Sequence, residues 1–540
     1  YTLADGDVET ISQICRLVEG MPLAIELAAG WLHVLSLQEI LAELDQNPDL
    51  LYTDMRDVPH RHRSIRTVFE HTWSLLNPAE QHTFMQLAVF RGGFTREAAQ
   101  AVTGASIQSL ASLVDKSVVR YRTQRRRFEI HELLRQYAQE QLENSPGESQ
   151  AVQQRHAAFF ADFSNERWDD LRGRRQRQGL NQIEADIENI RSAWRYYLQY
   201  GHAEQLGRFL HPLWIVYWIK GWNRAAVELF RSAVAALDIP GPTRAQEIVS
   251  ATSRANLAFF MSWLGMADEA LPVARESAAQ LEELRDFYGL LSAYNGLSLA
   301  AYYLGDLKTE KEATDRLLEL ARSVGDPWAL TYALSLSATS SLFPGEYAEA
   351  KELAEAGIKQ SAEVGEYFSS LISILTLGQV AQVDKDYPAA REHYERALGA
   401  SRQLGFFWGI ENATKYLGQI AYLEGNYAEA ETRFIDSLKI AYDFGLNRDI
   451  ANHLYEFARL RAFQGNQEEA VALLALLLRL PASRQTRLGE GSIRASARSL
   501  LEGLEPKLPP EQFSSAVQRG AEMDFDETLR ALIDLPASAA

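Results

Sequence analysis

The second half of the chain repeats one pattern of apolar, small and turn-forming residues every 40 positions. Apolar residues follow helical spacing on both sides of each turn, and the alternation typical of strands is not sustained there. The six turn positions are Gly265, Gly305, Gly345, Lys385, Gly425 and Gly465. The pattern therefore predicts a helix, a turn, a second helix and a second turn in each unit.

Small residues accompany each turn. Seven residues before it stand Ala258, Ser298, Ala338, Gly378, Gly418 and Ala458. Five residues after it stand Ala270, Ala350, Ala390, Ala430 and Ala470, with Glu310 as the exception. A further glycine divides four consecutive units, at Gly325, Gly365, Gly405 and Gly445, where the end of a helix favours left-handed backbone. Because one helix pair cannot bury its apolar face alone, the units are expected to stack into a superhelix with a concave binding surface.

The repeat organises the C-terminal two thirds of the chain. Residues 201–480 are predicted to form a solenoid of about seven helix pairs. Its first pair is degenerate, with Gly221 and Ala226 in register and bulky Trp214 where a small residue belongs. Residues 481–540 are predicted to form a helical C-terminal cap and tail, with helices near 492–501, 511–520 and 525–533.

The N-terminal third has a different pattern. Residues 1–55 are expected to form a short helical segment, and residues 56–145 a set of helices followed by one hairpin, which describes a winged helix. The hairpin strands are predicted at 118–121 and 128–131. Residues 146–200 are expected to supply two long linking helices around the basic turn Arg172–Arg175. The predicted fold class is therefore almost entirely α.

Composition and charge limit the partners and the cellular compartment that we expect for the protein. The 540 residues carry a formal net charge of −18, which disfavours a general attraction to nucleic acid or anionic membranes. Cys15 is the single cysteine, so an intrachain disulfide is excluded and a reducing compartment fits. There is no run of eighteen apolar residues. We expect a cytoplasmic protein without membrane contacts, and a start at Tyr1 suggests a piece of a longer chain.

The repeat resembles the tetratricopeptide repeat, in which a small residue of the first helix meets an alanine of the second. Leu257–Ala258, Leu377–Gly378 and Leu417–Gly418 match the leucine-small pair of that family, and Asn426–Ala430 matches the start of its second helix. The period of 40 is longer than the usual 34, and the proline that commonly ends the second helix is missing.

Three N-terminal motifs resemble those of STAND signalling ATPases of the NB-ARC type. They are Gly20–Ala24, Leu87–Thr95 and Ile130–Ala138, in the order of that family. The resemblance implies that Pro22 contacts adenine and that His131 reaches toward the β-phosphate of ADP. Ile130 and Glu132 replace the usual methionine and aspartate.

The phosphate-binding loop of that family is missing, because no G-x-x-x-x-G-K-[ST] motif occurs in the sequence. We therefore expect no cofactor and no enzymatic activity in this chain, and ADP or ATP with Mg²⁺ only in the full-length parent. No catalytic set of residues can be assembled, and His60 and His62 lack further metal ligands nearby.

The hairpin tip is basic. Arg122, Arg125, Arg126 and Arg127 are the candidate contacts to nucleic-acid phosphates. The alternative is a solvated tip, which we favour because the preceding helix 107–115 contains no cation. In the STAND family that the motifs resemble, the winged-helix domain mostly mediates autoinhibition.

The 40-residue register also predicts which residues lie on the inner face of the solenoid. They are those thirteen, ten, six and three residues before each turn. The candidate ligand residues there are Phe259, Asn295, Tyr302, Tyr332, Gln379, Lys415, Gln419, Tyr422, Asn452, Tyr455 and Arg459. Lys415 and Arg459 are the only cations of these rows, which disfavours a carboxylate ligand. A neutral peptide, a protein surface or a small polyhydroxylated ligand fits better, although some aromatic residues would simply pack between helices.

Together these features predict the switch and sensor portion of a bacterial STAND signal-transduction ATPase. An inducer, whether a protein, a peptide or a small molecule, would bind the concave face, and the winged helix would hold an upstream NTPase domain in its resting ADP state. Oligomerisation on activation would be compatible with this role. Two alternatives are a transcriptional regulator whose winged helix binds DNA and a constitutive protein-binding scaffold.

Overall fold

The computed structural model describes residues 7–18, 20, 24–25, 28–29, 31–33, 35–46, 65–342, 344–444, 447–480 and 493–534. The chain divides into two compact units. The first comprises residues 1–164 and 182–200, and the second comprises residues 165–181 and 201–540. The segment predicted to link the two parts is thus shared between them.

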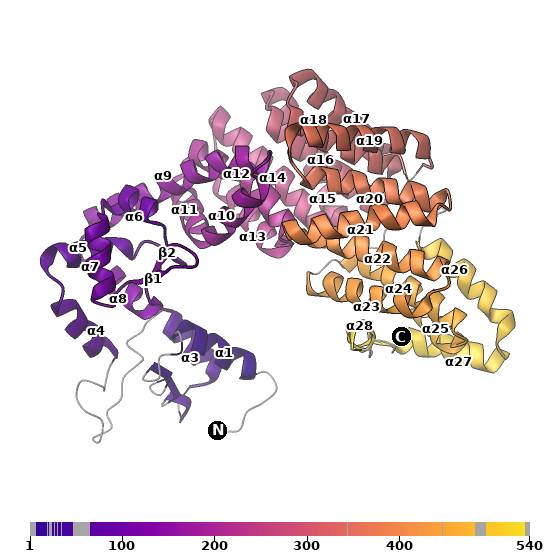
Figure 1. Ribbon diagram of the computed structural model, residues 1–540, viewed down its shortest axis with the longest axis horizontal. Helices are drawn as coiled ribbons and strands as arrows, with labels where there is room; N and C mark the ends of the chain where they lie inside the picture. Colours follow the sequence, from indigo (N-terminus) through magenta and orange to yellow (C-terminus); the bar gives the residue numbers. More distant parts are fainter. Residues whose placement is uncertain are drawn as a thin grey trace. The chain divides into compact units, whose positions relative to one another are not determined.

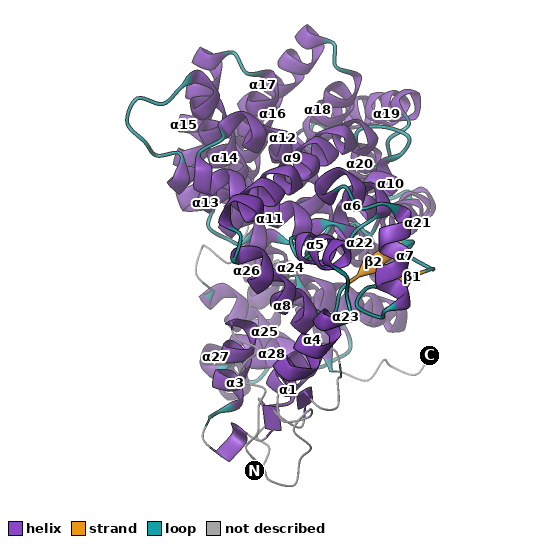
Figure 2. Ribbon diagram, turned by 90° about the vertical axis from the view of Figure 1, so that its left-hand side faces the viewer, coloured by secondary structure: helices purple, strands orange, loops and turns teal. Residues whose placement is uncertain are grey.

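The first unit is helical apart from one hairpin (Figures 1 and 2). Its elements are α1 (Asp7–Leu17), η1 (Trp31–His33), α3 (Leu37–Gln46), α4 (Ile65–Ser74), α5 (Pro78–Leu87), α6 (Arg96–Thr103), α7 (Ile107–Asp115), β1 (Arg120–Arg122), β2 (Arg127–Glu129), α8 (Glu132–Glu143), most of α9 (Pro146–Leu171), the last four residues of α10 (Gln176–Ala185) and α11 (Ile187–Tyr200). Ile14 and Ile40 share one core with Phe69 of α4 and with Leu133 and Tyr137 of α8. The N-terminal helices therefore pack onto the hairpin-containing part.

The hairpin is shorter than predicted. β1 and β2 have three residues each and pair antiparallel, with Tyr121 opposite Phe128. Phe94 adds an isolated bridge to Phe128. Gly93 makes this approach possible, because a Cβ there would lie 2.8 Å from the Phe128 carbonyl oxygen and its φ is +90°.

Two helix boundaries of this unit have clear local causes. α5 begins at Pro78, because Asn77 and Glu80 form a capping box and proline suits the first turn. The segment 146–200 contains three helices rather than two, since α10 and α11 are separated at Asp186. The Asp186 carboxylate is buried there and forms an ion pair with Arg127 of β2.

The second unit is an α-solenoid (Figure 1). Its helices are α12 (Ala203–Ile219), α13 (Asn223–Ala236), α14 (Arg244–Trp263), α15 (Ala267–Leu284), α16 (Phe287–Leu304), α17 (Leu307–Val324), α18 (Pro327–Ser340), α19 (Tyr347–Val364), α20 (Phe368–Val383), α21 (Tyr387–Leu404), α22 (Phe407–Leu423), α23 (Tyr427–Asp443), α24 (Asn447–Phe463) and α25 (Gln467–Arg479). The C-terminal elements α26 (Ile493–Leu504), η5 (Glu505–Lys507), α27 (Pro510–Glu522) and α28 (Phe525–Ile533) follow and pack on α23, α24 and α25. The nearly all-α fold and the repeated helix pairs are as predicted.

The turn register is confirmed in the backbone. All six predicted turn residues have positive φ, from +61° at Lys385 to +88° at Gly465. The mid-unit glycines Gly325, Gly365 and Gly405 also have positive φ, while Gly445 lies outside the described residues. Left-handed backbone thus follows the helices at these nine described positions, where the spacing placed it.

The small residues of the register lie where neighbouring helices approach closely. A Cβ at Gly418 would lie 2.7 Å from Cε1 of Phe434, on the second helix of the same pair. A Cβ at Gly378 would collide in the same way with the ring of Tyr394. Close helix packing therefore requires a glycine at these two positions.

This packing predicts opposite effects for two glycine-to-alanine changes. Gly418→Ala should destabilise the chain by about 1–3 kcal/mol, because the added methyl overpacks the contact with Phe434. Gly399→Ala, in α21, should stabilise it by up to about 1 kcal/mol, since nothing lies within 4 Å of a Cβ there and alanine favours helix. Denaturant unfolding followed by circular dichroism measures both. Equal shifts for the two variants would show that helix propensity, not packing, governs the register.

Candidate ligand-binding site

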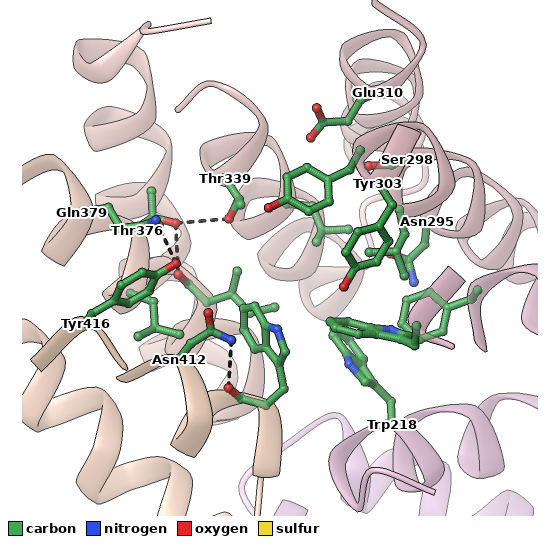
Figure 3. Close-up of a pocket in the computed structure, with 18 residues that line it drawn as sticks. Trp218, Asn295, Ser298, Tyr303, Glu310, Thr339, Thr376, Gln379, Asn412 and Tyr416 are labelled. Carbon is green, nitrogen blue, oxygen red and sulfur yellow. Dashed lines mark hydrogen bonds between the residues drawn. The ribbon is translucent and has the colours of Figure 1, made fainter. Parts of the chain in front are cut away.

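The solenoid contains a cavity of about 200 Å³. A single water requires roughly 10–15 Å³ measured in the same way, so the space suits a small organic molecule. Its walls come mainly from the first helices of five successive pairs, α14, α16, α18, α20 and α22 (Figure 3). The residues of this solenoid cavity are Trp218, Phe259, Trp263, Asn295, Ser298, Leu299, Tyr302, Tyr303, Glu310, Leu336, Thr339, Ile372, Leu375, Thr376, Gln379, Trp408, Asn412 and Tyr416.

Aromatic rings form much of the wall. Trp218, from α12, packs edge-on against Phe259 with ring centroids 5.2 Å apart. Trp263 likewise lies edge-on to Tyr303 at 5.8 Å and to Trp408 at 6.1 Å. Such contacts fix the rings in place, so the cavity is lined by rigid apolar surfaces.

Polar groups interrupt the aromatic wall. Gln379 donates through Nε2 to the Tyr416 hydroxyl at 3.0 Å, and the hydroxyls of Thr339 and Thr376 are 3.1 Å apart (Figure 3). Asn295 is 3% exposed, and its side chain acts on the Tyr332 hydroxyl, whose pKa it lowers.

Glu310 is the one charged residue among the eighteen that line the cavity. It stands on α17, at the register position that is alanine in the other five units, and it is 4% exposed. Burial raises the pKa of its carboxyl to about 8, against a smaller lowering by the Ser340 hydroxyl and the charge of Lys311. In the sequence, the replacement of this repeated alanine by Glu310 is the feature that indicates a special role.

Four predicted groove residues line the cavity: Phe259, Asn295, Tyr302 and Gln379. All four predicted rows contribute, since Ile372, Leu375 and Leu299 belong to them as well. The register did not include Trp218 and Trp408. Trp218 belongs to the degenerate first pair, and Trp408 lies at the start of its helix.

Two predicted groove residues are buried outside the cavity. Tyr332 is 1% exposed, stacks on Trp328 at 5.7 Å and meets Trp218 edge-on. Burial raises the pKa of its hydroxyl well above the usual value, against a lowering by Asn295. Lys415 is 4% exposed and its Nζ lies 3.2 Å from a Glu411 carboxylate oxygen. The expectation that both are accessible on the groove is corrected, because α12 fills the space beside Tyr332 and a carboxylate of its own helix neutralises Lys415.

The remaining groove candidates form a separate polar cluster on α22 and α24. Arg459 lies over the rings of Tyr422, at 4.4 Å, and Tyr455, at 5.6 Å, and pairs with Glu456 at 2.9 Å. Gln419 donates to the other oxygen of Glu456 at 2.9 Å. Asn452 is half-buried on the same helix. Arg459 is thus already paired, so these residues do not present a free cation.

His131 caps α8 in the first unit. It is 5% exposed, its Nδ1 accepts from the Leu133 backbone N–H at 3.3 Å, and its Nε2 lies 3.2 Å from the Val18 carbonyl oxygen. The ring therefore donates from Nε2 and links α8 to the end of α1. Its role toward a nucleotide stays a prediction. Pro22, His60 and His62 lie outside the described residues.

The four candidate arginines of the hairpin separate into two groups. Arg127 is 8% exposed and donates from both terminal nitrogens to Asp186, at 2.8 and 2.6 Å. Arg122 pairs with Glu129 at 2.8 Å. Arg125 and Arg126 are exposed at the turn. The expectation that Arg127 contacts phosphates is corrected, because its guanidinium is committed to a buried carboxylate.

Two further findings concern the described residues as a whole. No three His, Cys, Asp or Glu side chains within the described ranges gather so as to hold a metal ion. In the same part of the chain, every helix is too short or too polar to cross a membrane.

These features define a tetratricopeptide-like α-solenoid with an internal cavity. No family model matches the chain. A Mycobacterium tuberculosis protein provisionally named an HTH-type transcriptional regulator is 30% identical over 403 residues, which cover 68% of this chain and 43% of that protein. An uncharacterised protein of the same organism is 36% identical over 158 residues, covering 27% of this chain and 40% of its own length. The chain thus spans less than half of the curated relatives that it matches.

Solved structures with similar arrangements are also helical-repeat proteins. A STAND protein with a tetratricopeptide repeat sensor from Pyrococcus horikoshii aligns with a TM-score of 0.39 at 18% identity, over 84% of this chain and 70% of that chain. A Rap protein complexed with competence and sporulation factor aligns with a TM-score of 0.42 at 13% identity, over 66% of this chain and 99% of that chain. Both scores are below 0.5, so the solenoid assignment rests on the repeats of this chain.

Proposed function

We propose that the solenoid unit is the ligand-sensing part of a signalling regulator and that the solenoid cavity is its ligand site. The observation that carries this proposal is the cavity itself, where five successive helix pairs converge on one space. A ligand bound there touches all of them at once. Its binding energy can therefore favour one curvature of the solenoid over another, which is what a sensor requires.

The first unit would then be the switch. Its motifs resemble the helical and winged-helix parts of STAND ATPases, and we propose that it restrains an upstream NTPase domain of a longer parent until a ligand binds. In that arrangement His131 would stabilise the resting state by tying α8 to the end of α1. The name of the mycobacterial relative supports a regulatory role of this general kind.

Direct DNA binding through the hairpin is the second candidate, favoured by the relative's name and by the exposed Arg125 and Arg126. The hairpin offers fewer free cations than its sequence suggests, because Arg122 and Arg127 are paired with carboxylates. We therefore prefer the sensor function for the described part of the chain.

A thermal-shift screen of small molecules tests the proposal. A ligand at a hundred times its Kd should stabilise the folded chain by about 2.7 kcal/mol, which is a readily measured shift. Thr339→Phe, which fills the cavity, should abolish the shift. Gln419→Phe introduces the same ring at the same register position two repeats later, outside the cavity, and should retain the shift. Ligands that stabilise the Thr339→Phe variant equally well would contradict the proposed site.

A further inference from the structure

The starting observation is a buried carboxyl group at a position built for alanine. The other five units have an alanine there, and each is fully buried against the neighbouring helix. Glu310 breaks this column in the unit whose first helix supplies the largest number of cavity residues, α16. Burying a carboxyl is unfavourable without compensation, so the residue requires a partner that alanine would not need.

In the described part of the chain, no lysine, arginine or histidine forms an ion pair with Glu310. Lys311 is adjacent in sequence, but its ammonium group lies 3.3 Å from Glu349, 3.7 Å from Asp315 and 3.8 Å from Glu346. Among the described residues, Lys311 forms no ion pair with Glu310. The Ser340 hydroxyl is the polar group that lowers the pKa of Glu310, and Glu310 lines the cavity at one end of the group of side chains in Figure 3.

The other walls have the complementary property of attracting cations without carrying charge. The faces of indole and phenol rings are electronegative, and tryptophan is the strongest cation-binding side chain of this kind. Trp218, Trp263 and Trp408 all line the cavity, together with Tyr303 and Tyr416. No lysine, arginine or histidine is among the lining residues to repel a positive ligand.

We propose that the solenoid cavity binds an organic ammonium ion, with Glu310 as its counter-ion and the tryptophan rings as the walls that surround its alkyl groups. This inference rests on the proposed function of the cavity as a ligand site. It differs from the three ligand classes that the groove rows favoured, a neutral peptide, a protein surface and a small polyhydroxylated ligand. Those rows included neither Glu310 nor the tryptophans. Asn295 adds a polar side chain to the same cavity wall.

The protonation of Glu310 gives this site a characteristic pH dependence. Its pKa of about 8 in the empty cavity means that the carboxyl is largely protonated at neutral pH. A permanent cation binds the ionised form, so its affinity should rise as the pH increases from about 6 and level off above about 8. Lys311 from α17 and Ser340 from α18 are the charged and polar groups that act on it. Burial lowers the pKa of Lys311, but Asp315, Glu349 and Glu346 outweigh it, so this charge stays constant over that range.

Choline and 3,3-dimethylbutan-1-ol form a matched pair of probes, since they have the same shape and differ in one positive charge. Calorimetric titration of the full chain should show choline binding at least about tenfold more tightly than the neutral alcohol. Glu310→Gln should weaken choline binding by about tenfold or more, remove its pH dependence and leave the alcohol within about twofold. Equal affinities for the two probes, or choline binding unchanged in the variant, would overturn the inference.

Glu310→Ala separates loss of binding from loss of folding. It restores the alanine column of the repeat and removes a buried carboxyl, so the melting temperature should rise by a few degrees while choline binding is lost. The outcome also distinguishes the inference from the function on which it rests. If choline fails to bind but neutral molecules bind the wild type and not Thr339→Phe, the cationic class is wrong and the sensor site stands. If no molecule in the screen stabilises the chain through this cavity, the proposed function fails as well.

Discussion

Trp218→Ala should destabilise the solenoid unit by about 3–5 kcal/mol, the cost usually found when a large buried aromatic side chain is removed. Trp218 is 5% exposed, and its ring lies edge-on to Phe259, Phe368 and Phe406, with centroids 5.2, 4.6 and 5.9 Å away. Phe259 lies in α14, Phe368 begins α20 and Phe406 immediately precedes α22, so one side chain connects pairs that are far apart in the stack. Its removal should therefore loosen several units together rather than one.

A second variant, Trp222→Ala, distinguishes the specific role of Trp218 from the general effect of removing a tryptophan. Trp222 is four residues away, half-buried, and packs against Tyr217 at 5.4 Å. Trp222→Ala should cost clearly less, since it touches the end of α12 rather than the interior of the stack. Denaturant unfolding followed by far-UV circular dichroism compares the two variants. Because repeat proteins need not unfold in one step, the number of transitions should be reported as well as the midpoint. A smaller effect for Trp218→Ala than for Trp222→Ala would contradict the central role of Trp218.

Arg127→Met should destabilise the first unit by about 3–5 kcal/mol, because it leaves a buried carboxylate without its charge partner. Asp186 is 4% exposed and receives both terminal nitrogens of Arg127, and its Oδ1 also accepts from Asn189 at 2.9 Å. Arg127 donates in addition to the Gly93 carbonyl oxygen at 3.0 Å. The ion pair thus ties the hairpin to the junction of α10 and α11, within the same unit.

Arg125→Ala is the matched control for this prediction. It removes an arginine two residues away that is exposed at the turn, and it should change stability by less than about 0.5 kcal/mol. The double variant Arg127→Met with Asp186→Leu should cost less than the two single changes added together, since both buried charges are then absent. Thermal unfolding of the four variants tests this. A small effect for Arg127→Met, similar to that of Arg125→Ala, would show that the pair is not structural.

The sequence was most informative where one short pattern recurs. Many helix ends of the solenoid followed from the glycine register, because left-handed backbone is accessible to few residues and the described turn residues adopt it. Lys385 adopts the same conformation, with a φ of +61°, although it is not a glycine. The repeat around it therefore determines the local backbone more strongly than the residue does.

The candidate site was predictable only in part. The register placed Phe259, Asn295, Tyr302 and Gln379 correctly on the cavity, since each lies on the inner side of a first helix. It did not place Trp218, because the rows were taken from the six regular turns only, although Trp218 stands three residues before Gly221 of the degenerate pair. Nor does any local pattern connect Arg127 with Asp186, which are 59 residues apart. Such contacts depend on the tertiary arrangement, and that is not encoded in the period of a repeat.

The central claim is that ligand binding in the solenoid cavity is the sensing event. Hydrogen exchange of the chain, measured with and without the most stabilising molecule from the thermal-shift screen, tests it most directly. We expect slower exchange in α16, α20 and α22, and no slowing in the Thr339→Phe variant. Protection confined to helices that do not line the cavity, or protection that persists in Thr339→Phe, would contradict the account.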